Sequence, residues 1–343
     1  MTIKRKTRNG RGWPVVLFLF LAVQSCRNNQ PVTQEGDLAK PDSATVAKDP
    51  LPSWNDGPLK KSIIDYVSKV TRTGDPAFIP VADRIATFDN DGTLWAERPY
   101  MQELFAFYRV KEMIKANPAL AKKQPFKAVV EGDKSYFAKG GEKAAVQLVA
   151  LTHTGMTEEA FERSARAFIA EMKYPGRNVP VQQIVYRPQV ELLEYLRANG
   201  FKTFIVTGGT IEFVRTVSQE LYGIPPEQVV GTSFKYKYVD SNQSVMRLPE
   251  LDHFNDKTGK PVGIQLHIGK RPVFACGNEG GQGDIAMLHY SQGNRYPSFQ
   301  LLVNHNDSTR EFYYQEKDSL SLKTAASHQW HVVSMKDDWK NIW

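Results

Sequence analysis

The sequence predicts an α/β fold built on a mainly parallel sheet, because short apolar runs alternate with helical patterns along much of the chain. Three of these runs are apolar enough to be buried strands, at residues 85–88, 201–206 and 272–276. Each run leads into a loop that contains aspartate, threonine, asparagine or glycine. Because ligands of open α/β sheets bind at the carboxyl ends of the strands, these loops are candidate functional sites.

The composition excludes several classes of protein. With 41% hydrophobic and 24% charged residues among 343, the chain is neither collagen-like, nor a long coiled coil, nor wholly disordered. The length fits about two domains, or one core that carries a large insert. The formal charge of +7 is concentrated at the start, since residues 1–26 hold five basic and no acidic side chains. The remainder holds 39 basic and 37 acidic residues, so no nucleic-acid partner is expected.

Residues 1–26 have the pattern of an export signal, in which a basic stretch precedes an apolar run at 13–23. A helix over this run would be about 16 Å long, too short to cross about 30 Å of hydrocarbon. The ending Val23-Gln24-Ser25-Cys26 resembles the lipobox of bacterial lipoproteins, although Gln24 replaces the usual small residue. The resemblance implies acylation of Cys26, export to the bacterial cell envelope and membrane attachment through that lipid only. The alternative is an ordinary cleaved signal.

Residues 27–57 are rich in polar residues and proline and show no apolar periodicity. They are expected to form a flexible tether between the membrane and a folded domain.

Two aspartates, Asp89 and Asp91, stand directly after the first predicted strand, and Gly92 and Thr93 provide a turn behind them. Two carboxylates about 4 Å apart repel each other by roughly 4 kcal/mol at an effective dielectric constant of about 20. A magnesium ion between them removes this repulsion and also binds phosphate oxygens. One carboxylate can then attack phosphorus while the other handles the proton of the leaving group. The alternative is an Asx turn with two solvated aspartates.

The segment Asp89-Asn90-Asp91-Gly92-Thr93 resembles the first motif of the haloacid dehalogenase-like (HAD) hydrolase superfamily, Asp-x-Asp-Gly-Thr. The resemblance implies a Rossmann-like core, Mg²⁺ as cofactor, and an aspartyl-phosphate intermediate formed on Asp89. It also implies that Asp91 is the general acid/base, as in the phosphatases of the superfamily, and that its main-chain carbonyl is a magnesium ligand.

Two further segments resemble the second and third HAD motifs in the expected order. Thr207, with the free amides of Gly208 and Gly209, is expected to bind a phosphoryl oxygen near a helix N-terminus. A lysine that holds phosphate against the nucleophile should follow, and Lys257 and Lys260 are both candidates. Lys260 is the better match, because it directly precedes an apolar helical pattern.

The loop after the third strand resembles the fourth HAD motif, which supplies a metal ligand. Asn278, Glu279 and Asp284 are candidates, and Asp284 is preferred because it is anionic and adjoins the next helix. The structural alternative makes Asp284 only an N-cap. Cys276, within the strand, is expected to be a small buried hydrophobic residue and not a nucleophile.

Asp89 and Thr207 are 118 residues apart, a separation far greater than one crossover helix requires. The helical patterns between them resemble the helical cap that many HAD enzymes insert after the first motif. A small β-hairpin is also expected between residues 234 and 248. The predicted boundaries are a core at 58–97 and 186–343 and a cap at 98–185.

Other residues are candidates without belonging to a motif. His305 and Arg310 follow a further predicted strand and are candidates to approach the pocket, although neither falls in a HAD motif. Four aromatic residues after the nucleophile are expected mainly to pack the cap, the alternative being contact with a substrate, such as a cationic head group. These residues are Trp95, Tyr100, Phe105 and Tyr108.

The four ordered motifs predict a magnesium-dependent phosphomonoesterase that acts on a small phosphorylated metabolite. The cap position and motif order resemble phosphoserine phosphatase-type enzymes. The alternatives are a surface lipoprotein that binds phosphorylated ligands without turnover, and a HAD-type phosphomutase. No obligate protein partner is inferred.

Overall fold

The computed structural model describes residues 49–343 except residue 281. The predicted export signal at 1–26, the lipidation site Cys26 and residues 27–48 of the predicted tether lie outside this range. Within the described range, no helix combines the length and the apolar composition needed to span a bilayer.

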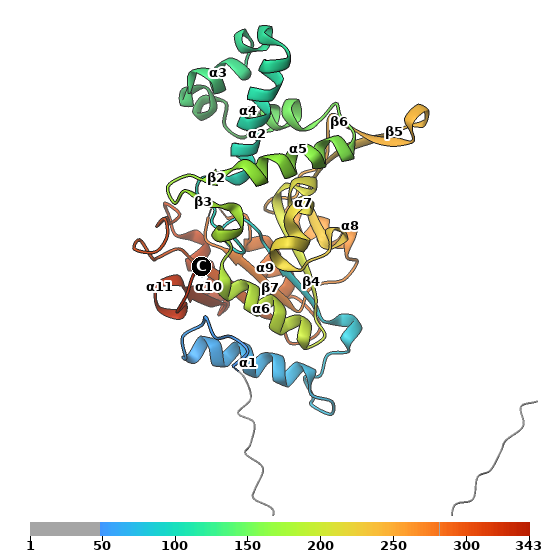
Figure 1. Ribbon diagram of the computed structural model, residues 1–343. Helices are drawn as coiled ribbons and strands as arrows, with labels where there is room; N and C mark the ends of the chain where they lie inside the picture. Colours follow the sequence, from blue (N-terminus) through green and yellow to red (C-terminus); the bar gives the residue numbers. More distant parts are fainter. Residues whose placement is uncertain (1–48, 281) are drawn as a thin grey trace, which may run out of the picture. The chain divides into compact units, whose positions relative to one another are not determined.

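A seven-stranded sheet lies at the centre of the described residues, in the order β6-β5-β4-β1-β7-β8-β9 (Figure 1). Five of its six strand pairs are parallel, and the pair of β5 and β6 is antiparallel. The prediction of an α/β fold with a mainly parallel sheet is therefore confirmed. The strands are β1 (Ile85–Phe88), β4 (Lys202–Thr210), β5 (Val229–Val239), β6 (Ser244–His253), β7 (Phe274–Asn278), β8 (Phe299–Asn304) and β9 (His331–Ser334).

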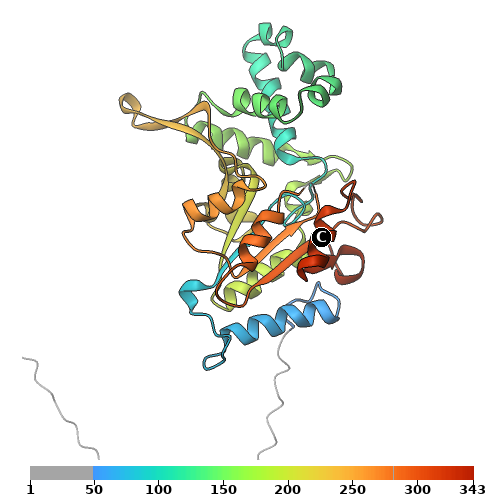
Figure 2. The ribbon, with the colours of Figure 1, turned by 180° about the vertical axis from the view of Figure 1, so that it is seen from behind.

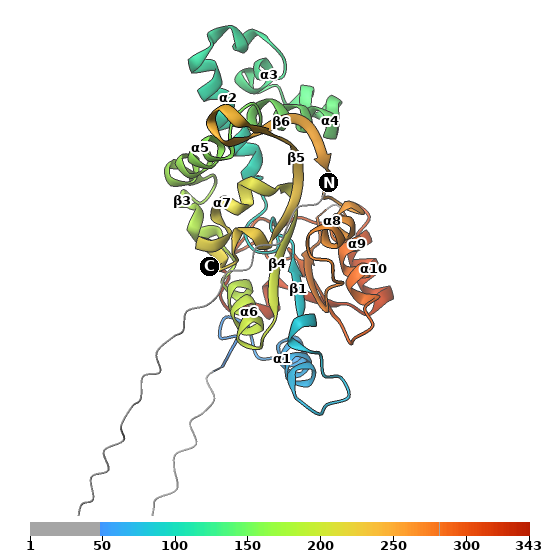
Figure 3. The same ribbon diagram turned by 90° about the vertical axis from the view of Figure 1, so that its right-hand side faces the viewer.

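Helices cover both faces of the sheet (Figure 3). Side chains alternate along each strand, so Ile205 belongs to an apolar cluster that includes residues of α1, α6 and α7, whereas its neighbour Val206 belongs to one that includes residues of α8, α9 and α10. Burial on both faces is typical of a parallel sheet. The helices of the core are α1 (Pro58–Thr71), α6 (Arg187–Ala198), α7 (Ile211–Tyr222), α8 (Gly259–His267), α9 (Ile285–Gln292), α10 (Leu320–His328) and α11 (Met335–Asp338).

The strand register brings the ends of the three central strands to the same edge of the sheet. Phe88 at the end of β1 lies opposite Ile205 of β4 on one side and Cys276 of β7 on the other. The loops that carry the predicted motifs therefore begin side by side. Cys276 is fully buried, and burial raises the pKa of its thiol, as expected of an unreactive core residue.

Four helices and a short two-stranded sheet lie between β1 and α6, beyond the carboxyl edge of the sheet (Figure 1). The ring of Phe105 is central to their packing, 5.5 Å from Phe161, 5.3 Å from Phe168 and 5.0 Å from Phe213 of the core. These elements fall within the segment predicted as a cap. They are α2 (Met101–Ala116), α3 (Phe126–Glu131), α4 (Lys134–His153), α5 (Glu158–Glu171), β2 (Lys173–Tyr174) and β3 (Val179–Pro180).

The expected hairpin is formed by β5 and β6 and extends from the sheet to the cap (Figure 2). Met246 of β6 forms a β-bridge with Thr157, and Arg247 makes two main-chain hydrogen bonds with the loop before α5. The guanidinium of Arg247 is fully buried, 2.9 Å from the carboxylate of Glu212 and 4.1 Å from the ring centre of Phe161. The hairpin thus ties the cap to α7 of the core.

Replacing Arg247 with methionine is expected to lower the free energy of unfolding by about 3–5 kcal/mol, because it leaves the buried Glu212 carboxylate without its cation. Equilibrium unfolding in urea measures this change. Lys235→Met is the matched control, since Lys235 of the same hairpin makes an exposed ion pair with Glu250 and should contribute less than about 1 kcal/mol. Equal losses in the two variants would contradict the role given to Arg247.

Residues 49–57, which the sequence places in the flexible tether, are packed against the core. Leu51 and Trp54 are buried, and the ring of Trp54 lies 6.0 Å from that of Trp339, edge to face. The N–H of Asn55 also donates to the carbonyl of Asp338. The tether prediction is therefore wrong for this segment. The sequence does not indicate this packing, because two isolated apolar residues form no periodic pattern and Trp339 lies near the other end of the chain.

Candidate active site

The predicted nucleophile, Asp89, follows β1 directly and lies beside the lysine predicted to hold phosphate. Oδ1 of Asp89 accepts a hydrogen bond from Nζ of Lys260 (2.6 Å), and Lys260 also donates to Oδ1 of Asp284. The exposed fractions of Asp89, Lys260 and Asp284 are 7%, 2% and 3%. One buried lysine therefore joins the loop after β1 to the loop after β7.

The charges of this cluster affect one another strongly because it is buried. Burial, reinforced by the negative charge of Asp284, raises the pKa of Asp89 well above its ordinary value. Burial opposes the charged form of Lys260, but the two carboxylates outweigh it and raise the pKa of the amine. Asp89 thus depends on neighbouring cations for its charged form.

Of the two candidate lysines, Lys260 reaches the site. The helix α8 begins at Gly259, so Lys260 stands in its first turn, where the sequence predicts the phosphate-binding lysine. Lys257 precedes the helix with a φ of 51° and is exposed.

Two of the three candidates after β7 face the cavity. Asp284 occupies the N-cap position of α9, but its side chain makes no capping hydrogen bond. Its Oδ2 instead accepts from the main-chain N–H of Asn278 (2.9 Å). Glu279 is buried elsewhere, where its Oε1 accepts from the N–H of Glu316 (3.0 Å). The structure therefore brings Asn278 and Asp284 to the site and leaves Glu279 outside it.

The amide of Asn278 lies between two oxygens of the predicted metal site. Its inward atom is 3.1 Å from the main-chain oxygen of Asp91 and 3.2 Å from Oδ2 of Asp284, and its outward atom is 3.1 Å from the hydroxyl of Tyr314. With its nitrogen inward, the amide donates to both oxygens. With its oxygen inward, three oxygen atoms converge, as they do around a hard cation. A half-turn of the amide separates the two arrangements.

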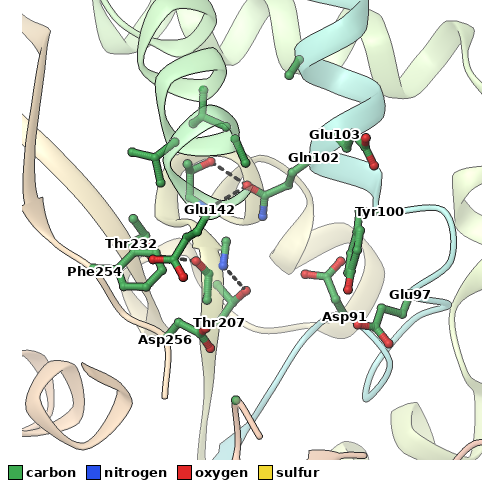
Figure 4. Close-up of a pocket in the computed structure, with 18 of the residues that line it drawn as sticks. Asp91, Glu97, Tyr100, Gln102, Glu103, Glu142, Thr207, Thr232, Phe254 and Asp256 are labelled. Carbon is green, nitrogen blue, oxygen red and sulfur yellow. Dashed lines mark hydrogen bonds between the residues drawn. The ribbon is translucent and has the colours of Figure 1, made fainter. Parts of the chain in front are cut away.

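Asp91, the predicted acid/base, is held by an aromatic residue that the sequence analysis assigned to packing. Trp95 is fully buried, and its Nε1 donates to Oδ1 of Asp91 (2.8 Å). Burial raises the pKa of Asp91, and the hydrogen bond from Trp95 offsets part of that rise. A raised pKa suits a carboxyl group that must donate a proton. The carboxyl group of Asp91 lies in the cavity beside Tyr100 (Figure 4).

The turn after the predicted acid/base has no room for a side chain. Gly92 has a φ of 75°, and a Cβ there would lie 2.2 Å from Nδ2 of Asn278. Its carbonyl is 2.8 Å from Nε2 of His305, whose Nδ1 is 2.9 Å from Glu311. His305 therefore supports the turn from behind the cavity, while Arg310 bonds to carbonyls near the C-terminus. The expectation that both residues approach the pocket is wrong.

The carboxyl end of β4 differs from its prediction in one respect. Thr207 and Gly208 line the cavity, as expected. The N–H of Gly209, however, donates to Oγ1 of Thr207 (3.0 Å) and is not free. The strand continues to Thr210, and α7 begins only after it. The expectation of two free amides is therefore wrong for Gly209, because the hydroxyl of Thr207 turns back onto the end of its own strand.

A cavity of about 560 Å³ lies over these residues, between the core and the cap (Figure 4). Asp89, Asp91, Thr207 and Lys260 form part of its core side. The cap and the hairpin supply the opposite walls, which include Gln102, Phe107, Phe137, Glu142 and Leu251.

A comparison with models of protein families matches residues 86–289 to the haloacid dehalogenase-like hydrolases. The chain belongs to this family. The matched range contains all four motifs, so the membership expected from their resemblance is confirmed. No curated protein sequence matches the chain.

The chain is similar to several solved structures at low sequence identity. A conserved protein of unknown function from Anaerococcus prevotii has a TM-score of 0.54 at 16% identity, over 82% of this chain and 94% of its own. A protein of unknown function from Bordetella pertussis has a TM-score of 0.49 at 15% identity, over 74% and 98%. A phosphoserine phosphohydrolase-like protein from Francisella tularensis has a TM-score of 0.38 at 16% identity, over 73% and 94%. The similarity to the Anaerococcus prevotii protein shows a shared fold and says nothing about function.

The metal-binding set predicted from the sequence, Asp89, Asp91, Asp284 and Asn278, stays a prediction. In the part of the chain that the structure describes, no three His, Cys, Asp or Glu side chains are grouped to hold a metal ion. The reason is that Lys260 lies between Asp89 and Asp284, while the Asp91 side chain bonds elsewhere. The oxygens around the Asn278 amide nevertheless fit a hard cation.

Some residues of the HAD site escaped the sequence analysis. Gln102 and Glu142 line the cavity from the cap, and Tyr314 contacts Asn278 from a segment after β8. No motif marks these positions. They reach the site only because the insert and the C-terminal segment fold over the edge of the sheet.

Proposed function

We propose that this HAD hydrolase is a magnesium-dependent phosphomonoesterase that acts on a small phosphorylated metabolite. The observation that carries the proposal is the contact of Lys260 with both Asp89 and Asp284 beside an open cavity. This lysine places a positive charge next to the nucleophile, where a phosphate dianion must approach carboxylates.

In the first step, an oxygen of Asp89 attacks phosphorus, and the bond from phosphorus to the alcohol oxygen breaks as the new bond forms. Asp91 gives its proton to that oxygen, so the alcohol leaves in its neutral form. Thr207 and the main chain of Gly208, which line the cavity, would bind phosphoryl oxygens, and Lys260 would balance their charge.

In the second step, water attacks the phosphorus of the aspartyl-phosphate, and Asp91 accepts the proton of that water. Inorganic phosphate leaves, the carboxylate of Asp89 is restored, and Asp91 is protonated again. This acid/base role typically contributes about 10²- to 10⁴-fold to the rate. Trp95 bonds to Oδ1 of Asp91 alone, which leaves Oδ2 to carry the proton.

Magnesium, when bound, would neutralise charge on the phosphoryl oxygens. The ligands would be Asp89, the main-chain oxygen of Asp91, Asp284 and the amide oxygen of Asn278. The amide of Asn278 takes part with its oxygen inward and its nitrogen toward the hydroxyl of Tyr314, the orientation in which Nδ2 donates to that hydroxyl. The hydroxyl of Tyr314 suits either orientation of the amide, because a hydroxyl both donates and accepts.

Removing divalent cations from the full-length protein in detergent is expected to abolish release of phosphate from phosphomonoesters. Added magnesium should restore it. Asn278→Ala should raise the magnesium concentration that gives half-maximal activity by about tenfold or more, because it removes one oxygen ligand. Measured phosphate release across a magnesium titration tests both statements. Full activity after exhaustive chelation would contradict the proposed role of the metal.

A further inference from the structure

The cavity extends well beyond the space that a phosphoryl group requires, into a region that we call the outer cavity. Its walls come from the cap and the hairpin, and they are mainly apolar, with Phe107, Phe137, Val149, Leu251 and Phe254 among them. A substrate that fills this region buries apolar surface on its alcohol part, which favours binding.

The charges of the outer cavity are of one sign. Glu103 and Glu142 line it from the cap, Glu97 and Asp256 line the cavity nearer to the core residues, and among the described lining residues Lys260 carries the only positive charge. That lysine is already bonded to Asp89 and Asp284. Figure 4 shows Glu142 reaching from the cap toward the core side, where Asp256 and Thr207 lie.

The charges of Arg98 and, at Glu103, of Lys134 offset part of the rise that burial causes in the pKa values of Glu97 and Glu103, but neither cation lines the cavity. Arg98 lies 3.9 Å from Glu97, but its guanidinium stacks between the rings of Tyr100 and Tyr314, 4.5 Å and 5.2 Å from their centres. It is not among the lining residues. A carboxylate or second phosphate on the alcohol part would therefore meet like charge, whereas a cation would meet opposite charge.

The side chain of Gln102 lies in the cavity wall, between the phosphate-binding residues and the outer cavity, and has a hydrogen-bond donor available to a ligand. Oε1 of Gln102 accepts from the N–H (2.7 Å) and from Oγ1 (2.8 Å) of Thr210, which fixes the orientation of the amide. Its Nε2 is buried without a partner among the described residues. A Cβ at Gly209 would lie 1.8 Å from this nitrogen, so the glycine leaves room for it. The free donor belongs to a lining residue and suits a phosphoryl oxygen at the start of the outer cavity.

We infer that the substrate is a phosphate monoester of an amino alcohol: a small alcohol with an apolar body and a positively charged nitrogen, primary or quaternary. This inference rests on the proposed phosphomonoesterase function. The phosphoryl group binds Lys260 and the Gln102 amide, and the nitrogen lies among the carboxylates of the outer cavity. Phosphoserine fits less well, because its carboxylate has no cation there.

Two matched pairs of substrates test the inference with the full-length protein and magnesium. Phosphocholine is compared with 3,3-dimethylbutyl phosphate, in which carbon replaces the charged nitrogen at the same size. Phosphoethanolamine is compared with phosphoserine, which adds one carboxylate. The value of kcat/KM is expected to be at least about tenfold higher for the first member of each pair. Equal values within both pairs would overturn the inference.

Variants identify the responsible side chains. Glu142→Gln and Glu103→Gln keep the size of the side chain and remove its charge, so the ratio of kcat/KM between phosphocholine and its neutral analogue should fall severalfold. Glu131→Gln is the matched control, because Glu131 is an exposed cap carboxylate outside the cavity, and it should keep the wild-type ratio. An unchanged ratio in both cavity variants would contradict the inference.

The outcomes separate this inference from the proposal on which it rests. If the neutral analogue and p-nitrophenyl phosphate are hydrolysed as well as the cationic esters, the enzyme is a phosphomonoesterase and the substrate class is wrong. If no phosphomonoester is hydrolysed, the proposed function itself fails.

Discussion

Asp89→Asn is expected to lower kcat for phosphomonoester hydrolysis by at least about 10⁴-fold, because an amide oxygen is a poor nucleophile toward phosphorus. The substitution keeps the size of the side chain and an acceptor for Lys260. Release of inorganic phosphate by the full-length protein with magnesium measures the effect. Equal rates in wild type and variant would remove Asp89 as the nucleophile.

The same variant should be at least as stable as the wild type in magnesium-free buffer. Burial raises the pKa of Asp89 in the folded protein, so the charged form of this carboxyl group costs more free energy there than in the unfolded chain. Ionisation of Asp89 therefore opposes folding as the pH rises, and a neutral amide removes that cost. Thermal unfolding at pH 7 measures the difference. A clearly lower Tm would assign the lost activity to folding instead of chemistry.

Product analysis of the wild-type reaction separates hydrolysis from the two alternatives left open by the sequence. A phosphatase releases inorganic phosphate in amounts equal to the alcohol. A phosphomutase returns an isomer of the phosphorylated substrate and little free phosphate. A protein that binds without turnover releases neither product, and its Asp89→Asn variant would bind phosphorylated ligands as the wild type does.

The central sheet and the identity of its catalytic loops could be predicted because they depend on local sequence. The strand β1 is a short apolar run, and the aspartates stand at its end, where the parallel register brings them to Thr207 and Asn278. The position of Lys260 was also predictable. Lys260 stands in the first turn of α8, and the start of this helix directs the lysine toward the edge of the sheet. In these cases one short segment carries both the chemical motif and the sequence pattern that predicts its secondary structure.

The remainder depended on contacts between distant segments. Trp95 read as a packing residue, because nothing local shows that its indole nitrogen bonds to Asp91. Gln102 has no motif, and its role arises from the fixed distance between α2 and the carboxyl end of β4. The burial of Trp54 against Trp339 joins the two ends of the described chain. Contacts of this kind leave no periodic pattern in the sequence of either segment.

Lys260→Met is expected to have the second large effect, on stability and activity together. It leaves Asp89 and Asp284 as two buried carboxylates without their shared cation. The free energy of unfolding at pH 7 should fall by about 3–5 kcal/mol. The loss of the charge that holds the phosphoryl group should lower kcat/KM by about 10²- to 10³-fold. Lys257→Met is the matched control, because Lys257 is exposed three residues earlier, and it should change neither quantity appreciably.

The pH dependence of this variant gives a check that a general folding defect would not pass. Without the lysine, the two buried carboxylates can relieve their repulsion only by binding a proton, so the pKa of Asp89 in the folded state should rise further above its unfolded value. The folded state then binds more protons than the unfolded state, and its stability rises as the pH falls. The stability deficit of Lys260→Met against wild type should therefore be smaller at pH 5 than at pH 8. Urea unfolding at the two pH values measures it. A deficit that is constant or larger at pH 5 would show that Lys260 does not act by neutralising these two carboxylates.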